Sequence, residues 1–314
     1  MSKPLIHIGF HKTGSSLLQR QVFASREVGF FQPCNKAELI HRAFILRDPG
    51  QPCEPRALAE LHQAHATAQS QDQVMVLSHE RLSGYPASGG YDQFDIAHRL
   101  AEGFPDANVL IVIREQRSAM LSMYLQTISD GSALTLKEFL DPPEAHIRRQ
   151  PLFRKSFYAY HTLIARYQAL FGEDKVKVLP YEWLRTQPGH FAAELVEFSG
   201  AEPRPDIDVN QLVDSPLNPS LPVAFQMMRR QSNKLLRSQL SNSGPIMIPA
   251  TSVQAAVKKI RPALLPLSVF DAPLKRRLRK LIAQHTNGVY ADSNSEVEAL
   301  TGLDLRSLGY PLPG

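Results

Sequence analysis

The feature that most constrains the fold is a short, almost purely apolar run, Asn108–Ile113 (Asn-Val-Leu-Ile-Val-Ile). A run this short and this rich in β-branched residues is typical of a strand buried on both faces, as in a parallel sheet. Similar runs occur at Leu5–Gly9, Gln73–Ser78 and Lys175–Leu179. Helical patterns separate them, which predicts an α/β fold with a central parallel sheet flanked by helices in a three-layer sandwich.

The helices between and after these strands follow from apolar periodicity and from the positions of glycine and proline. After Gly200, prolines and asparagines become frequent, and two basic helices and an intervening proline-containing loop, Gly244–Pro266, are expected. We predict a single domain over 1–314, with an α/β core over 1–200 and a helical section over 201–314. The expected helices are Ser15–Phe23, Ala57–Ala68, Ser118–Ser129, Phe157–Phe171, Gly189–Phe198, Val223–Leu240 and Pro273–His285.

Composition narrows the class of protein. The 314 residues carry a formal charge of +5, which suits an anionic ligand but does not require nucleic acid, and no nucleic-acid partner is expected. Only two cysteines occur, Cys34 and Cys53, too few for a disulfide framework or a CxxC metal site. No apolar run is long enough to span a membrane and no signal-peptide core opens the chain, so the sequence predicts a soluble cytoplasmic protein.

A glycine-containing segment, Gly9-Phe10-His11-Lys12-Thr13-Gly14-Ser15-Ser16, lies between the first strand and the first helix. Gly9 and Gly14 have Walker-loop spacing, but Ser15 stands where the usual lysine would be, and the lysine is Lys12. Glycines allow a close approach of backbone to phosphate, and hydroxyl and ammonium donors complete an anion site. The segment therefore predicts phosphate binding, although short glycine patterns also occur by chance.

A second candidate anion site follows the strand Asn108–Ile113. Arg114 lies at its carboxyl end, where open α/β sheets bind ligands, and Ser122 lies one to two turns into the next helix. A guanidinium and a hydroxyl suit a phosphate monoester. No acidic residue takes the position of Arg114, which argues against the Mg²⁺-binding arrangement of an ordinary ATPase or kinase.

Together, the two segments resemble the sulfotransferase family that uses 3′-phosphoadenosine 5′-phosphosulfate (PAPS), in its bacterial carbohydrate-sulfotransferase-like branch. In that family a Lys-Thr-Gly-Ser-Ser-like loop binds the 5′-phosphosulfate, and an Arg with a Ser eight positions on binds the 3′-phosphate. Leu179-Pro180-Tyr181-Glu182-Trp183-Leu184 and the tail segments at 290–294 and 303–311 are also similar. Gln116, where many relatives have proline, and the lack of an Arg-Lys-Gly segment are departures.

The resemblance implies sulfuryl transfer from PAPS to a hydroxyl or amine of an acceptor. The expected acceptor is a saccharide, the product is adenosine 3′,5′-bisphosphate, and no metal is expected. The section over 201–314 would shape the acceptor cleft. Lys12 is the candidate for stabilising the leaving oxygen. The nucleotide would be bound by His11, Lys12, Thr13, Gly14, Ser15, Ser16, Arg114 and Ser122.

The acceptor must lose a proton, and polar residues after the strand Gln73–Ser78 are candidates for the base. Glu80 and His79 both fit, with Glu80 slightly favoured; neighbouring residues near a strand end point to opposite sides, so one of them is expected to face the cleft. His11 is a third candidate, which the charge of Lys12 would keep neutral. Sugar rings could stack on Tyr85, Tyr91, Tyr158, Tyr160 or His161.

Two other functions stay open at this point. A small-molecule kinase would use the Gly9–Ser16 loop with ATP and Mg²⁺, and a non-catalytic module would bind an adenine nucleotide or an anionic glycan. The sequence does not identify the acceptor or the oligomeric state.

Overall fold

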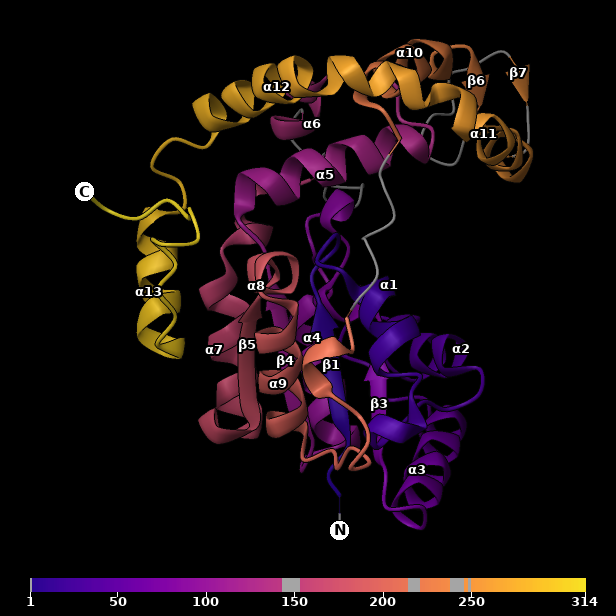
Figure 1. Cartoon of the computed structure of the whole chain (residues 1–314), viewed down its shortest axis with the longest axis vertical. Helices are drawn as coiled ribbons and strands as arrows, with labels where there is room; N and C mark the ends of the chain where they lie inside the picture. Colours follow the sequence, from indigo (N-terminus) through magenta and orange to yellow (C-terminus); the bar gives the residue numbers. More distant parts are fainter. Residues whose placement is uncertain (1, 143–152, 214–220, 238–245, 248–249) are drawn as a thin grey trace. The chain divides into compact units, whose positions relative to one another are not determined.

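A computed structural model describes residues 2–142, 153–213, 221–237, 246–247 and 250–314. Its main sheet has five parallel strands in the order β2-β3-β1-β4-β5 (Figure 1). The predicted parallel sheet with flanking helices is therefore confirmed. The strands are β1 (Leu5–Gly9), β2 (Phe30–Phe31), β3 (Val74–Ser78), β4 (Asn108–Ile113) and β5 (Val176–Pro180).

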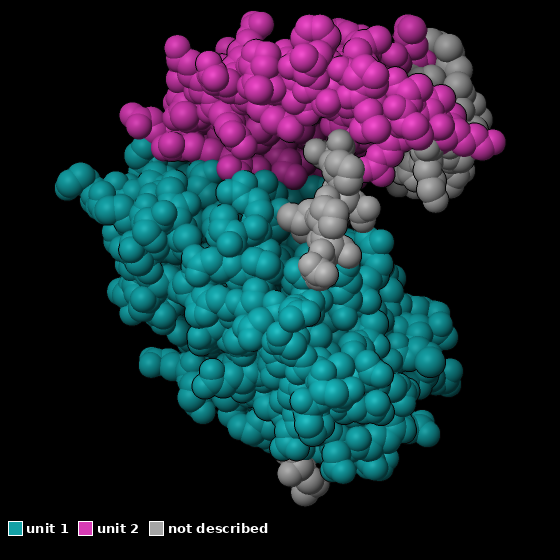
Figure 2. All heavy atoms as spheres, in the orientation of Figure 1, with its two compact units in different colours: residues 1–115, 156–217, 288–314 teal, residues 116–155, 218–287 magenta. Residues whose placement is uncertain are grey.

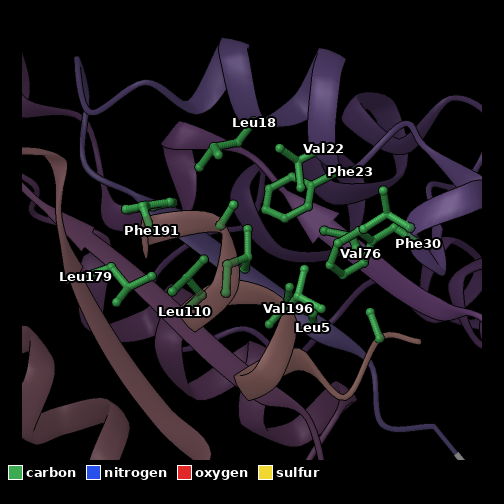
Figure 3. Close-up of a cluster of buried hydrophobic side chains, with 14 of the residues drawn as sticks. Leu5, Leu18, Val22, Phe23, Phe30, Val76, Leu110, Leu179, Phe191 and Val196 are labelled. Carbon is green, nitrogen blue, oxygen red and sulfur yellow. The ribbon is translucent and has the colours of Figure 1, made fainter. Parts of the chain in front are cut away.

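The strands are buried on both faces, which explains their continuous apolar character. Alternate residues such as Leu5, Leu110 and Leu179 point to one face, where they pack against side chains of the first helical segment and of α9 (Figure 3). On the other face Phe10 packs edge-to-face against Phe157 and Tyr160, with ring centroids 5.3 and 4.6 Å away. Both faces of the sheet are thus covered by helices.

The chain divides into two compact units (Figure 2). The first comprises 1–115, 156–217 and 288–314 and contains the five-stranded sheet. Its first helix, α1, is a three-residue piece that continues as a π-helical turn over Leu18–Val22. The α-helices of this unit are α1 (Ser15–Leu17), α2 (Lys36–Ile40), α3 (Pro55–Gln69), α4 (Gln93–Gly103), α7 (Tyr160–Phe171), α8 (Tyr181–Thr186), α9 (Pro188–Ser199) and α13 (Ala291–Thr301).

The second unit comprises 116–155 and 218–287 and is mainly helical. Side-chain bonds to main-chain carbonyls join its two segments: Asn233 donates to Ile128 O and Ser132 O, and Arg229 donates to Ser129 O. Two short strands, β6 (Leu236–Arg237) and β7 (Ile246–Met247), pair in parallel. The α-helices are α5 (Gln116–Ser129), α6 (Leu136–Leu140), α10 (Val223–Asn233), α11 (Ala250–Leu264) and α12 (Asp271–His285).

The four predicted strands agree with the structure to within one residue at each end. The predicted loop over Gly244–Pro266 is wrong for 250–264, which form α11. Of the prolines in 244–266, two precede α11 and Pro262 lies near its end. The helix therefore forms despite the proline content that indicated a loop. The helix predicted over Val223–Leu240 ends at Asn233, and residues 238–240 lie outside the described ones. The single-domain prediction stays a prediction.

Candidate functional site

The loop between β1 and α1 has an unusual backbone. Lys12 has a φ of 72° and Gly14 a φ of 87°, so two of its residues adopt the left-handed conformation. Glycine adopts it freely, but for lysine it costs about 1 kcal/mol or more, and such strain is concentrated at functional sites. The hydroxyl of Thr13, fully buried, donates to Phe10 O at 2.5 Å. Thr13 therefore stabilises the turn from within, and its predicted role as a phosphate donor stays a prediction.

Ser15 and Gly9 meet at the base of the loop. The Ser15 hydroxyl is buried and has no hydrogen-bond partner within the described chain. A Cβ on Gly9 would lie 2.2 Å from this oxygen, so only glycine leaves room for Ser15 there. A buried donor without a protein partner is unfavourable unless something else accepts its hydrogen bond. Ser15 therefore fits a bound anion, while Ser16 beside it is exposed.

Arg114 reaches this loop from the end of β4. Its Nη1 donates to the main-chain carbonyl of Lys12 at 2.8 Å, and its guanidinium carbon lies 4.7 Å from the centroid of the Tyr181 ring. The Tyr160 hydroxyl donates to Arg114 O at 2.6 Å and holds the strand end in place. Because β1 and β4 are parallel neighbours, their carboxyl ends bring the two predicted segments side by side.

Glu182 ties three segments together behind Arg114. One of its carboxylate oxygens accepts from the Glu115 main-chain N–H at 3.1 Å, and the other accepts from the Tyr310 hydroxyl at 3.1 Å. Burial raises the pKa of Glu182 above its usual value, and these hydrogen bonds together with the charge of Arg114 act against that shift. The C-terminal segment is thereby anchored to the same edge of the sheet as the loop.

Ser122 lies half-buried on α5, in the second unit. Its predicted cooperation with Arg114, which belongs to the first unit, therefore stays a prediction.

His79 follows β3 and has both ring nitrogens in hydrogen bonds. The Arg81 main-chain N–H donates to its Nδ1 at 3.0 Å, and its Nε2 lies 3.1 Å from Nε2 of His41. Since a main-chain N–H can only donate, Nδ1 holds the lone pair and the proton of the neutral ring is on Nε2, directed at His41. Burial, with the charges of His41, Arg81 and Lys36, lowers the pKa of His79 to about 4.

Glu80 begins the 3-10 turn Glu80–Ser83 and is half-buried. Its carboxylate makes no hydrogen bond or ion pair with the described part of the chain, and its charge raises the pKa of His41 against the larger effect of burial. His79 and Glu80 thus differ: the base nitrogen of His79 is occupied by a protein donor, whereas the carboxylate of Glu80 is not. The assignment of the catalytic base stays a prediction.

His11 is half-buried beside Tyr85, with ring centroids 5.2 Å apart. Burial, and then the charges of Arg81, His79 and Lys12, lower its pKa to about 3, so His11 is neutral at pH 7. The expected direction is confirmed, but burial rather than Lys12 is the main cause. Its Nδ1 has no partner within the described chain. Arg81 in turn forms an ion pair with Asp92 at 2.6 Å, which fixes the guanidinium next to this histidine.

Two of the predicted sugar-stacking residues are corrected by their burial. Tyr158 and Tyr160 are fully buried and belong to the aromatic cluster around Phe10, because that face of the sheet requires large apolar rings. Tyr91 is exposed, and Tyr85 and His161 are half-buried.

Among the described residues no group of three or more His, Cys, Asp or Glu side chains could hold a metal ion. None of the described helices has both the length and the apolar character of a membrane span.

With this geometry established, comparison with known proteins finds partial likenesses to solved structures, among them the following two. A sulfotransferase from Alicyclobacillus acidocaldarius is 20% identical, with a TM-score of 0.48, over 74% of this chain and 96% of that one. A sulfotransferase domain from the curacin biosynthetic pathway is 12% identical, with a TM-score of 0.43, over 83% of this chain and 98% of that one. No protein-family model and no curated protein matches the sequence.

Sequence reasoning did not find the roles of His41, Tyr181 and Tyr310. Each contacts its partner across a long sequence separation: His41 with His79, Tyr181 with Arg114, and Tyr310 with Glu182. Tyr181 and Tyr310 stand in segments noted only for their similarity to the sulfotransferase pattern. His41 had no signal of its own, because a single histidine in an amphipathic helix is usually only a partly buried residue.

Proposed function

We propose that this chain transfers a sulfuryl group from PAPS to a hydroxyl or amine of an acceptor, with a saccharide as the acceptor class. The observation that carries the proposal is the 2.8 Å hydrogen bond from Arg114 to Lys12 O. It supports a site in which the phosphosulfate loop and the arginine of the 3′-phosphate motif serve one nucleotide. A doubly phosphorylated nucleoside suits two cationic donors from neighbouring strand ends better than a nucleotide that carries phosphate at one end only.

The residues of the loop fit the phosphosulfate end of the donor. Ser15 supplies a buried hydroxyl that has no hydrogen-bond partner among the described residues, and the exposed Ser16 and Lys12 supply further donors. Lys12 would stabilise charge on the oxygen that links sulfur to phosphorus as this bond breaks. Its left-handed backbone fits the same role, since it is strain held in the loop that would bind the leaving group.

Transfer then requires one base and one bond exchange. The acceptor oxygen or nitrogen forms a bond to sulfur, the bond from sulfur to the phosphate oxygen breaks, and adenosine 3′,5′-bisphosphate leaves. Glu80 accepts the acceptor's proton, because its carboxylate is not engaged by the described chain whereas Nδ1 of His79 already accepts from Arg81 N–H. His79 and His41 then act as neutral groups that position the residues next to Glu80.

The saccharide class of acceptor rests on the similarity of the tail residues to bacterial carbohydrate sulfotransferases. Tyr310 belongs to that similarity, and its hydroxyl bonds to Glu182 beside Arg114, which supports a role for the tail in the architecture of the donor site. A screen of saccharide, amine and small alcohol acceptors with sulfur-labelled PAPS tests the class directly. If only the amines give labelled product, the acceptor class is an amine and not a saccharide.

Calorimetric titration of adenosine 3′,5′-bisphosphate, 5′-AMP and ATP tests the donor. We expect the bisphosphate to bind at least about tenfold more tightly than 5′-AMP, and Arg114→Ala to remove most of that difference, because a charge-assisted hydrogen bond contributes about 1.5–3 kcal/mol. Tyr181→Phe, which keeps the ring under the guanidinium, is the matched control and should bind as the unaltered protein does. Equal affinity for 5′-AMP and the bisphosphate would overturn the proposal, and Mg²⁺-dependent preference for ATP would favour a kinase.

A further inference from the structure

The charge of this chain is unevenly distributed along its sequence. Residues 218–287 contain twelve Lys and Arg against a single Asp and no Glu, a net charge of +11. Because the whole chain carries +5, the other 244 residues have a net charge of −6. The small net charge of the whole chain is therefore the sum of a strongly basic segment, 218–287, and an acidic remainder. The basic segment forms most of the second unit. Charge asymmetry of this size indicates an anionic partner for that segment.

Helix α12 concentrates four of these cations on one face. Arg276, Arg277, Arg279 and Lys280 are all exposed, and at 100° per residue they lie within an arc of about 160°. The opposite face carries Leu274, Leu278 and the fully buried Ile282. The helix is thus held to its own unit by one face, and it presents the cations to solvent on the other. None of the four makes an ion pair with the described residues, whereas Lys275 pairs with Asp271 at 3.0 Å.

Exposed apolar side chains directly precede this cationic face. The 3-10 segment Leu265–Phe270 connects α11 to α12, and within it Leu265 is 50%, Val269 72% and Phe270 56% exposed. Arg276 follows Phe270 by six positions, which is about 9 Å along a helix. Single exposed apolar residues are common, but three in one six-residue segment beside a row of cations form an amphipathic patch.

We propose that this patch, the 3-10 segment Leu265–Phe270 with the cations Arg276, Arg277, Arg279 and Lys280, binds the surface of an anionic lipid bilayer. Arginine and lysine would lie at the level of the lipid phosphates, and Val269 and Phe270 would enter the boundary with the acyl chains. A nucleic acid or a polyanionic glycan matches the cations but not the exposed apolar residues. A second copy of this chain matches the apolar residues but would bring two strongly positive surfaces together.

Co-sedimentation with vesicles tests the proposal on the full-length chain. We expect binding to phosphatidylcholine vesicles that contain phosphatidylserine, little binding to phosphatidylcholine alone, and a loss of binding at high salt. Each cation near an anionic bilayer strengthens binding about fivefold, so Arg276→Gln, Arg277→Gln, Arg279→Gln and Lys280→Gln combined should weaken it at least about 50-fold. Circular dichroism should show that this variant keeps its helical content, because the four side chains are exposed.

Two further variants separate the possible partners. Lys3→Gln, Arg56→Gln, Arg185→Gln and Arg306→Gln combined removes the same charge from exposed positions of the first unit and should leave vesicle binding unchanged. Val269→Ser with Phe270→Ser should weaken binding to vesicles but not to duplex DNA or heparin. If the chain binds DNA or heparin but not vesicles, the partner of the patch is a polyanion and not a membrane. If the chain does not bind vesicles but forms a dimer, and if Val269→Ser with Phe270→Ser dissociates that dimer, the partner of the patch is a second copy of the chain.

Discussion

The imidazole rings of His41 and His79 meet at their Nε2 atoms, 3.1 Å apart, while the other nitrogen of His79 accepts the main-chain N–H of Arg81. Neither histidine gains a proton easily, because burial and nearby Arg81 lower the pKa of both. The pair is therefore a neutral, mutually oriented unit at the end of β3. The carboxylate of its neighbour Glu80 makes no hydrogen bond or ion pair with the described chain.

Glu80→Gln should lower kcat about 10²- to 10⁴-fold, the usual contribution of a general base, with little change in bisphosphate affinity. His79→Gln should lower kcat far less, because its role is to orient its neighbours. Steady-state sulfuryl transfer and calorimetry on both variants check this. A large loss in His79→Gln with a small one in Glu80→Gln would assign the base to His79 instead.

Lys12→Ala should reduce kcat far more than it reduces bisphosphate affinity, because an ammonium that acts on the leaving oxygen matters most in the transition state. Lys12→Gly is the matched control: it also removes the ammonium, but its backbone adopts the φ of 72° without strain. Equal kinetic losses in the two variants locate the effect in the side chain. If affinity and kcat fall in parallel, Lys12 is a binding group only.

Gly14→Ala should destabilise the fold by more than a comparable change at Gly200. Both glycines have positive φ, 87° and 69°, which costs an alanine about 1 kcal/mol. At Gly14 the new Cβ would also lie 2.6 Å from Cδ2 of the buried Leu184, whereas at Gly200 nothing lies within 4 Å. Urea unfolding should show an additional loss of about 1 kcal/mol for Gly14→Ala. Equal losses at the two positions would mean that Leu184 moves aside freely.

Acid should destabilise the chain through its buried histidines. Burial, and then Lys36, lowers the pKa of His7 from 6.5 to about 3, and Nδ1 of this residue lies 2.7 Å from the Ser78 hydroxyl. Between these values the unfolded state binds a proton that the folded state does not. The free energy of unfolding is therefore unaffected by His7 above about pH 6.5 and falls as the pH drops from 6.5 towards 3. His7→Gln should therefore reduce the loss between pH 7 and pH 4.5 by about 2–3 kcal/mol, measured by urea unfolding. An unchanged pH profile would mean that His7 does not titrate on unfolding in this range.

Local sequence patterns determined the strands and most of the core helices. The runs at Leu5–Gly9 and Asn108–Ile113 are apolar on both faces, and that pattern is compatible with little besides a strand inside a covered sheet. The glycines at 9 and 14 and the arginine at 114 likewise marked the ends of neighbouring strands. Helix α11 was missed because its prolines, counted as composition, indicated a loop, whereas their positions permit a helix.

Only the tertiary structure decided which of these residues touch. Strand order placed β1 beside β4, and so brought Arg114 to the carbonyl of Lys12, a contact between residues 102 positions apart. It also buried Tyr158 and Tyr160, paired His41 with His79, and committed the Thr13 hydroxyl to the loop's own backbone. Sequence periodicity reports which face of an element is apolar, but contacts between distant side chains depend on how the elements pack, and that information is not local.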